Sequence, residues 1–313
     1  MGVRSLDLLD LPFLRRYHRN VLPLDHARFL TGGNPLGPGA LLSYLNPRGN
    51  IYTAVSSEDG NSLMGQVLLK EDETSAHLTF LAPLENSDGL TDPLIDHLIV
   101  QAGEWGAFHL LAEVAEDVPL LVSLRKVGFS IYAWQRIWKL PELKGSGNAS
   151  PWREVGELDW PAIQSLQGQI VPGLIQPVEA LPRQAQGRIC RSAGELQAYV
   201  RVLHGPAGIW LQPLVPPDSS CLSDSLLQLA GELESRKPLP IYVCVRSYQA
   251  WLEPALEELG AEAGPRQAVM VHRLAKAIKE FQGVAVVDNT LAKVKPAAPV
   301  SRLVADRDPA SKK

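Results

Sequence analysis

The chain has 313 residues, of which 45% are hydrophobic and 20% charged, and its formal net charge is −4 at pH 7. These values are ordinary for folded globular proteins, and the length favours about two domains of roughly 150 residues each. The balanced charge gives no electrostatic reason to expect a nucleic acid or an anionic membrane as partner. No apolar run approaches the roughly 20 residues of a membrane helix, so we expect a cytoplasmic protein without a membrane partner.

The chain carries few residues that bind metals or form disulfides. Its three cysteines, Cys190, Cys221 and Cys244, are widely spaced and odd in number, and its seven histidines include no HxxxH pair. Disulfide frameworks and metal sites use an even or closely spaced set of such residues. The sequence therefore predicts no disulfide framework and no metal site.

The first half begins with three apolar, β-rich runs separated by turn-forming clusters, which predict an antiparallel meander. The period then changes from two to 3.6 residues, which predicts a helix with Leu94 and Ile95 on its buried stripe and Thr91 or Asp92 as its cap. A strand, a short helix that stops at Gly128, and a last strand follow. The ranges are 51–57, 63–71 and 76–83 for the meander, about 91–102 for the helix, and 109–114, 119–128 and 129–140 for the rest.

The second half repeats this order of elements. Its predicted meander, helix, strand, helix and final strand lie at 188–192, 195–204, 208–215, 222–233, 240–246, 250–260 and 266–274. A fixed offset links the halves, because Gly128 and Gly260 are 132 residues apart, as are Gln135 and Gln267. Several such pairs in the same order indicate a duplicated domain.

These patterns predict domains at residues 1–142 and 152–278, a Pro/Gly/Ser-bearing linker at 143–151, and a disordered tail at 279–313. Strands that are apolar on both faces, separated by helices, favour an α/β sheet covered on both sides.

The order of these elements, with "LAP" ending a strand and "AEVAEDVPLLVSLRKVGF" closing the first half, resembles the GNAT N-acetyltransferase superfamily. "VRSYQAWLEPALEELGAE" in the second half is similar. The resemblance covers nearly the whole chain except the linker and tail. It implies an α/β (α+β) fold class: two tandem GNAT-like domains, each a mostly antiparallel mixed sheet flanked by helices.

In that superfamily acetyl-CoA lies in a cleft where two central strands splay apart. Its pyrophosphate binds backbone N–H groups of a Q/R-x-x-G-x-G/A loop at a helix start, where free amides and the helix dipole suit an anion. Alignment places this loop on residues 86–91, where only Gly89 matches strictly; residues 218–223 of the second half contain no glycine. The resemblance implies acetyl-CoA as co-substrate, bound by Leu81, Asn86, Ser87, Gly89, Leu90 and Thr91.

Acyl transfer to an amine needs a base for the amine and an acid for the leaving thiolate. His77 and Glu113 are the candidate bases, while Leu124 and Leu256 stand where the family often has a proton-donating tyrosine. Two interpretations stay open. One is an acyl-CoA-dependent N-acyltransferase that acts on a small-molecule or peptide amine. The other is a catalytically inactive GNAT-like binding or regulatory protein.

Overall fold

The computed structural model describes residues 2–7, 17–37, 50–71, 73–83, 89–141, 151–182, 186–192, 194–219, 222–233 and 239–274. Residues 1–276 form one compact unit. Most of the predicted linker and the predicted disordered tail lie outside the described residues.

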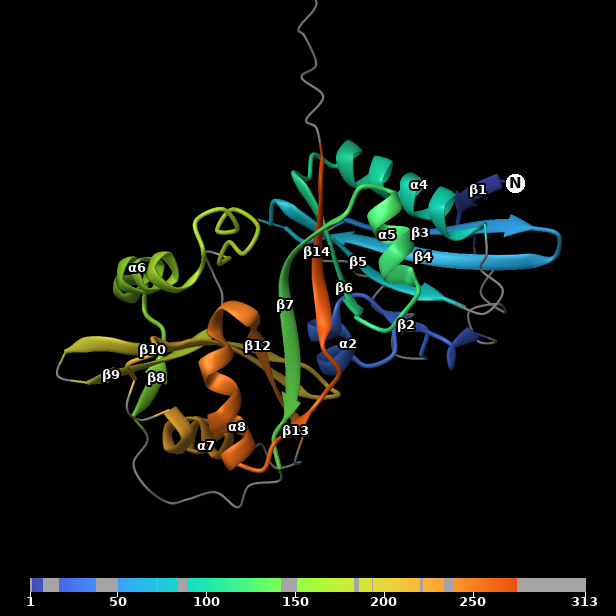
Figure 1. Cartoon of the computed structure of the whole chain (residues 1–313). Coiled ribbons are helices and arrows are strands. Elements are labelled where there is room, and N and C mark those ends of the chain that lie inside the picture. The colour runs from blue at the N-terminus through green and yellow to red at the C-terminus, as the bar shows by residue number, and fades with distance from the viewer. Residues whose placement is uncertain are drawn as a thin grey trace, which may run out of the picture. The chain divides into compact units, whose positions relative to one another are not determined.

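The fourteen strands of the described chain form one sheet (Figure 1). Their order is β1-β3-β4-β5-β6-β14-β7-β12-β11-β10-β9-β8, while β2 pairs with β5 and β13 with β7. The strands of the first half are β1 (Gly2–Ser5), β2 (Leu22–Pro23), β3 (Asn50–Glu58), β4 (Asn61–Leu69), β5 (Ser75–Ala82), β6 (His109–Ala115) and β7 (Ser130–Lys139). Those of the second half are β8 (Trp152–Glu154), β9 (Gly187–Ser192), β10 (Glu195–His204), β11 (Ile209–Leu214), β12 (Ile241–Arg246), β13 (Glu262–Ala263) and β14 (Gln267–Arg273).

The helices lie between these strands. The first half contains α2 (His26–Gly32), α4 (Thr91–Glu104) and α5 (Leu120–Lys126). The second contains the 3₁₀ turns η2 (Glu157–Asp159) and η3 (Ser247–Leu252), and the helices α6 (Trp160–Ile170), α7 (Leu222–Leu233) and α8 (Glu253–Glu258).

The predicted repeat is present in the sheet. Each half contributes an antiparallel meander, and its third strand then pairs in parallel with the strand that follows the helix, as β5 with β6 and β11 with β12. The remaining pairs are antiparallel. The predicted fold class, tandem repeats that each form a mostly antiparallel mixed sheet with flanking helices, is confirmed, although the two sheets are joined into one. The domain boundaries stay a prediction.

The central strands exchange partners between the repeats. β7, the last main strand of the first repeat, pairs with β12 of the second, and β14 of the second pairs with β6 of the first. β7 and β14 also pair with each other, antiparallel, with Gln135 opposite Gln267. If each of these strands is replaced by its equivalent in the other repeat, β6 by β12 and β14 by β7, the order β6-β14-β7-β12 is the same when read in the opposite direction. The 132-residue offset corresponds to a local two-fold axis between these two glutamines.

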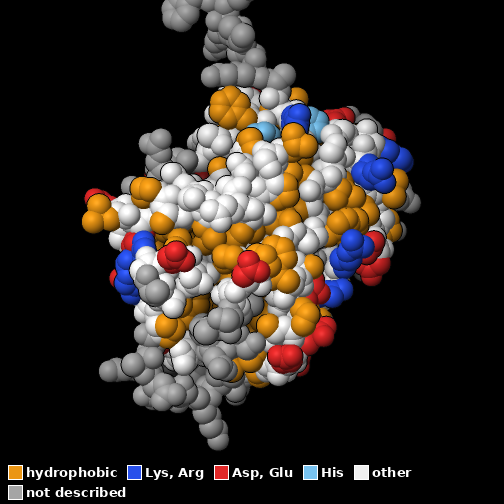
Figure 2. All heavy atoms as spheres, turned by 60° about the vertical axis from the view of Figure 1, so that its left-hand side comes forward, with side chains coloured by type: hydrophobic (Ala, Val, Ile, Leu, Met, Phe, Trp, Pro, Cys, Tyr) orange, Lys and Arg blue, Asp and Glu red, His pale blue; other side chains and the backbone are white. Residues whose placement is uncertain are grey.

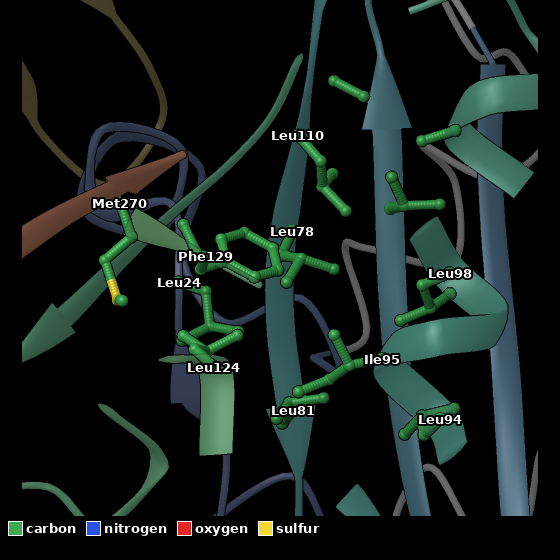
Figure 3. Close-up of a cluster of buried hydrophobic side chains, with 14 of the residues drawn as sticks. Leu24, Leu78, Leu81, Leu94, Ile95, Leu98, Leu110, Leu124, Phe129 and Met270 are labelled. Atoms are coloured by element: carbon green, nitrogen blue, oxygen red, sulfur yellow. The ribbon is translucent and has the colours of Figure 1, made fainter. Parts of the chain in front are cut away.

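The exchange carries side chains of each repeat into the other's core. Met270 of β14 belongs to the core of the first repeat, where Figure 3 shows it with side chains of β5, β6 and α4. In return, Trp138 of β7 is buried in the core of the second repeat, under α7 and α8. The apolar pattern of residues 129–140 follows from this position, since Trp138 lies in the second core while Ile137, on the opposite face of β7, packs with residues of α2.

Alternation along the strands assigns the helices to faces of the sheet. Val243 and Val245 of β12 lie in the second core with α7 and α8, whereas Cys244 between them packs with Ala27 and Leu30 of α2. In the first repeat, α4 and α5 share a core with alternate residues of β6, and α2 bonds to the opposite face of that strand. The helices α4, α5, α7 and α8 thus cover one face, and α2 covers the other near the centre.

The helix α2 also joins the repeats through a close backbone approach. Ala207, in the turn between β10 and β11, donates its N–H to the carbonyl of Thr31 at 2.9 Å. Gly205 of the same turn lies so near that a Cβ atom there would overlap the Thr31 carbonyl. Only glycine fits this position without a shift of the backbone.

We expect Gly205→Ala to lower the free energy of unfolding by about 1–3 kcal/mol, because the added methyl separates α2 from the turn. Gly168→Ala is the matched control: a Cβ at this position in α6 meets nothing within 4 Å, so the helix gains up to about 1 kcal/mol. Urea denaturation followed by circular dichroism measures both. Equal stability of the two variants would contradict the prediction.

Candidate active-site region

The strands β5 and β6 separate along their length. They pair only where Ser75–His77 lie beside His109–Leu111. Beyond that point β5 continues to Ala82 and β6 to Ala115 with no pairing between them. A gap between two central strands, of the kind that the resemblance implies, is therefore present in the first repeat.

The gap is filled by residues 22–24. β2 pairs with β5 through Leu22 and Leu81 and through Pro23 and Phe80. Leu24 then donates its N–H to the carbonyl of Thr79 and accepts the N–H of Glu113, each at 2.9 Å. Its side chain is 1% exposed and packs in the first core. The segment therefore satisfies backbone groups of both splayed strands, and sequence reasoning missed it because it is too short to show a periodic pattern.

The predicted acetyl-CoA loop is described in part, since Asn86 and Ser87 lie outside the described residues. Gly89 has φ +81° and a Cβ there would meet nothing within 4 Å. Leu90 is buried and precedes α4, and Thr91 is the first residue of that helix. Leu81 faces the first core rather than open space.

The prediction that Thr91 or Asp92 caps α4 is wrong. Leu90 adopts a helical conformation at the N-cap position, so the helix begins one residue earlier than a capping Thr91 requires. A leucine side chain cannot accept a hydrogen bond, and the first-turn amides of a helix have no intrahelical partners. The side chain at the N-cap position therefore does not cap α4, and Gly89 lies directly before that position.

In the second repeat the corresponding gap holds a side-chain amide. β11 and β12 pair only through Ile209–Leu211 and Ile241–Val243. Beyond them Gln249, 1% exposed, accepts the N–H of Val215 at 3.1 Å and donates to the carbonyl of Pro213 at 3.0 Å. One amide group thus takes the place that a neighbouring strand would occupy.

The two candidate bases, His77 and Glu113, lie on neighbouring strands, and each lies close to one of two consecutive residues, Asp25 and His26. His77 Nδ1 on β5 is 4.0 Å from Asp25 Oδ2, and its Nε2 is 3.8 Å from Glu73 Oε2. Glu113 on β6 accepts a hydrogen bond from the backbone N–H of His26 at 3.0 Å and lies 3.2 Å from its Nδ1. The structure therefore brings both candidates to the α2 side of the sheet.

Glu113 also belongs to a cluster of buried polar side chains at the centre of the sheet. Arg246 Nη1 lies 3.7 Å from Glu113 Oε1, and Arg246 Nε lies 2.9 Å from Glu179 Oε1. Arg246 donates to Gln135, which in turn donates to Gln267 at 2.7 Å. We call this set the central polar cluster: His26, Glu113, Gln135, Glu179, Arg246 and Gln267.

The cluster sets the charge of Glu113. Burial alone would raise the pKa of this carboxyl, but the hydrogen bonds and charge of His26 and the charge of Arg246 outweigh it and hold the pKa at about 2. Glu113 is therefore ionised at neutral pH and a weak proton acceptor. Sequence reasoning did not identify Arg246, although a lone charge at the end of the apolar run "IYVCVR" was the available signal.

Leu124 and Leu256, at the positions where the resemblance would place a proton donor, are both fully buried. Within the described ranges, no three His, Cys, Asp or Glu side chains lie close enough to hold a metal ion.

Charges of both signs are interspersed on the face drawn in Figure 2. In the part of the chain that the structure describes, no helix has the length and apolar character to span a membrane.

Two solved structures with the same fold are named as acetyltransferases, one of them as putative. A GCN5-related N-acetyltransferase from Sphaerobacter thermophilus aligns at TM-score 0.54 with 12% identity, over 87% of this chain and 95% of that one. A putative acetyltransferase from Pyrococcus horikoshii aligns at 0.50 with 11% identity, over 88% and 89%. No protein-family model and no curated protein matches the sequence. Because one neighbour spans both repeats, the chain has the GNAT fold in a tandem arrangement.

We expect Glu113→Gln to lower the free energy of unfolding by about 3 kcal/mol at neutral pH, because a buried charge network loses its anion. The folded-state pKa of about 2 lies below the ordinary value near 4.5, so the stabilisation is complete above about pH 4.5 and disappears as the pH falls towards 2. Urea denaturation at a series of pH values should show the two proteins converging over that interval.

Glu116→Gln is the control for this prediction. Glu116 lies 3.3 Å from Arg266 in an exposed pair, for which the expected loss is below about 1 kcal/mol. A difference between wild type and Glu113→Gln that does not change with pH would contradict the assignment.

Proposed function

We propose that the protein is an acyl-CoA-dependent N-acyltransferase that moves an acetyl group from acetyl-CoA to the amine of a small molecule or peptide. The observation that carries this proposal is the gap between β5 and β6 in a GNAT fold, with Leu94 of α4 and Leu81 at the end of β5 both close to Gly65. Fold alone does not determine chemistry, so the proposal depends on what this gap and its surroundings bind.

The start of α4 supports a phosphate site. The helix has 14 residues, its N-cap carries no side-chain hydrogen bond, and Gly89 directly precedes that cap with open space around its Cα. Backbone amides at the positive end of a helix dipole attract phosphate oxygens, and glycine permits close approach. In this proposal Asn86, Ser87, Gly89, Leu90 and Thr91 bind the pyrophosphate. The backbone of Leu81, which pairs with Leu22, borders the path of the acyl arm.

The proposal requires residues 22–24 to leave the gap when acetyl-CoA binds. Their backbone bonds to Thr79 and Glu113 occupy the groups that an extended ligand would use. A protein whose competent state is a minor fraction binds with an affinity reduced by that fraction. Acyl-CoA binding is then coupled to displacement of this segment.

His77 is the better placed of the two candidate bases. Its side chain is 26% exposed and lies on the same face as Asp25, whereas Glu113 has a pKa near 2 and is held by His26 and Arg246. We propose that His77 accepts the amine proton. A water molecule would protonate the leaving thiolate, because Leu124 cannot donate a proton.

A second candidate is a GNAT-like binding protein without catalysis. The filled gap in the first repeat and the bridging amide of Gln249 in the second favour it, since each supplies from the chain the contacts that a cofactor would make.

We expect acetyl-CoA to raise the melting temperature of the wild type and to give measurable heat by isothermal titration, and Gly89→Glu to abolish both. A glutamate there brings a negative charge and a Cβ to the proposed pyrophosphate site. Gly106→Glu is the matched control, because Gly106 also has φ +81° and open surroundings but follows the other end of α4. If the wild type does not bind acetyl-CoA at millimolar concentration, the proposed acyl transfer is contradicted and the non-catalytic candidate remains.

We expect Leu24→Ala to strengthen acetyl-CoA binding although it lowers the free energy of unfolding by about 2–5 kcal/mol. The substitution weakens the packing of the segment that closes the gap, and so raises the fraction of open protein. Leu78→Ala removes a fully buried side chain of the same core that is not on the segment, and should destabilise without strengthening binding. Unchanged affinity in Leu24→Ala would show that the segment does not control access.

A further inference from the structure

A cavity of about 370 Å³ lies on the α2 side of the first repeat. Residues of α2, of all three strands of the first meander (β3, β4 and β5) and of the turn between β10 and β11 line it, so both repeats form its walls. This volume falls within the range of small-molecule sites, which usually combine apolar walls with a few convergent polar groups. Phe29, Ile51, Pro35 and Pro206 supply apolar surface here.

The floor of the cavity is polar and ordered. Gln66 of β4 and Thr79 of β5 both line it and are 1% and 4% exposed. The Thr79 hydroxyl donates to Gln66 Oε1 at 2.8 Å, and Gln66 Nε2 donates to the Thr53 hydroxyl at 3.0 Å. Because these bonds hold the side chains in one arrangement, the floor presents hydrogen-bonding groups at fixed positions.

Two opposite charges, those of Asp25 and Arg28, line the same cavity without pairing with each other. Asp25 is 6% exposed; its Oδ1 accepts the backbone N–H of Arg28 at 3.1 Å, and its Oδ2 lies 4.0 Å from His77 Nδ1, beyond hydrogen-bond distance. The Arg28 guanidinium forms no ion pair with any residue that the structure describes, Asp25 included. A buried carboxylate and an unpaired guanidinium each leave charge that a ligand could neutralise.

We propose that this cavity binds a small zwitterion of the amino-acid type, with its ammonium group on Asp25 and its carboxylate on Arg28. Asp25 is the N-cap residue of α2 and Arg28 lies in the first turn of that helix, and both line the cavity. Two opposite charges on the wall of one cavity suit a molecule whose amine and carboxylate are a few bonds apart. The guanidinium binds the carboxylate through two parallel hydrogen bonds, and Gln66 and Thr79 contact the remainder of the ligand.

The position of the cavity relates this ligand to the gap. Thr79 lines the cavity with its side chain, while its backbone carbonyl accepts the N–H of Leu24 in the gap. The amine on Asp25 would therefore lie beside the place where an acyl group arrives, and would be its acceptor. That last step rests on the proposed function, whereas binding of the zwitterion does not.

The test is isothermal titration and thermal shift of the full-length protein with the common amino acids and short ω-amino acids, without any thioester. We expect at least one to bind, and its N-acetyl and methyl-ester derivatives, which each lack one charge, to bind at least tenfold more weakly. Arg28→Gln and Asp25→Asn should each weaken binding by roughly ten- to a hundredfold, the effect of losing one charge-assisted contact. Asparagine can still cap α2, so Asp25→Asn keeps the helix start.

Arg125→Gln, at an exposed arginine of α5, is the control and should bind like the wild type. The proposal is overturned if no zwitterion binds the wild type, or if Arg28→Gln and Asp25→Asn bind as tightly as Arg125→Gln while circular dichroism shows all of them folded. Binding of a zwitterion with no binding of acetyl-CoA would support this site and remove the proposed acyl transfer. Binding of acetyl-CoA alone would do the reverse.

Discussion

The antiparallel pairing of β7 with β14 is the interaction on which the rest of the structure depends. It joins the two repeats into one continuous sheet and gives each repeat a strand of the other. Polar groups at such a junction must find partners because they are removed from water. Gln135 and Gln267 meet this requirement through each other, and Arg246 through Gln135 and two carboxylates.

The two splayed gaps show a second constraint, that of unpaired backbone. Where two strands diverge inside a protein, their N–H and C=O groups need other partners. The first repeat uses the main chain of residues 22–24 and the second uses the amide of Gln249. A cofactor entering either gap would have to replace these hydrogen bonds as well as add its own. Entry of a cofactor into a gap is thus an equilibrium between hydrogen bonds within the chain and hydrogen bonds to the cofactor. The position of that equilibrium decides between an enzyme and a binding protein.

The order of strands and helices could be predicted because each of those elements has a clear period in its apolar residues. The partners of β7 could not, since a strand that is apolar on both faces predicts burial without identifying its neighbours. The offset pair Gln135 and Gln267 was visible in the sequence, but an offset does not show that two residues touch. In the candidate site, the positions of His77 and Glu113 followed from the strand pattern, whereas the roles of Arg246 and Asp25 depend on contacts between distant segments.

The glutamine pair has a consequence for how the two repeats could diverge. An amide both donates and accepts, so a glutamine on a two-fold axis can pair with an identical copy of itself. A guanidinium there would face its own positive charge. The register shows that Arg246 stands opposite Gln135, while the equivalent position opposite Gln267 is Ala115. Because the repeats are joined in one chain, their sequences are free to differ. A single arginine can therefore lie close to the axis with carboxylates around it.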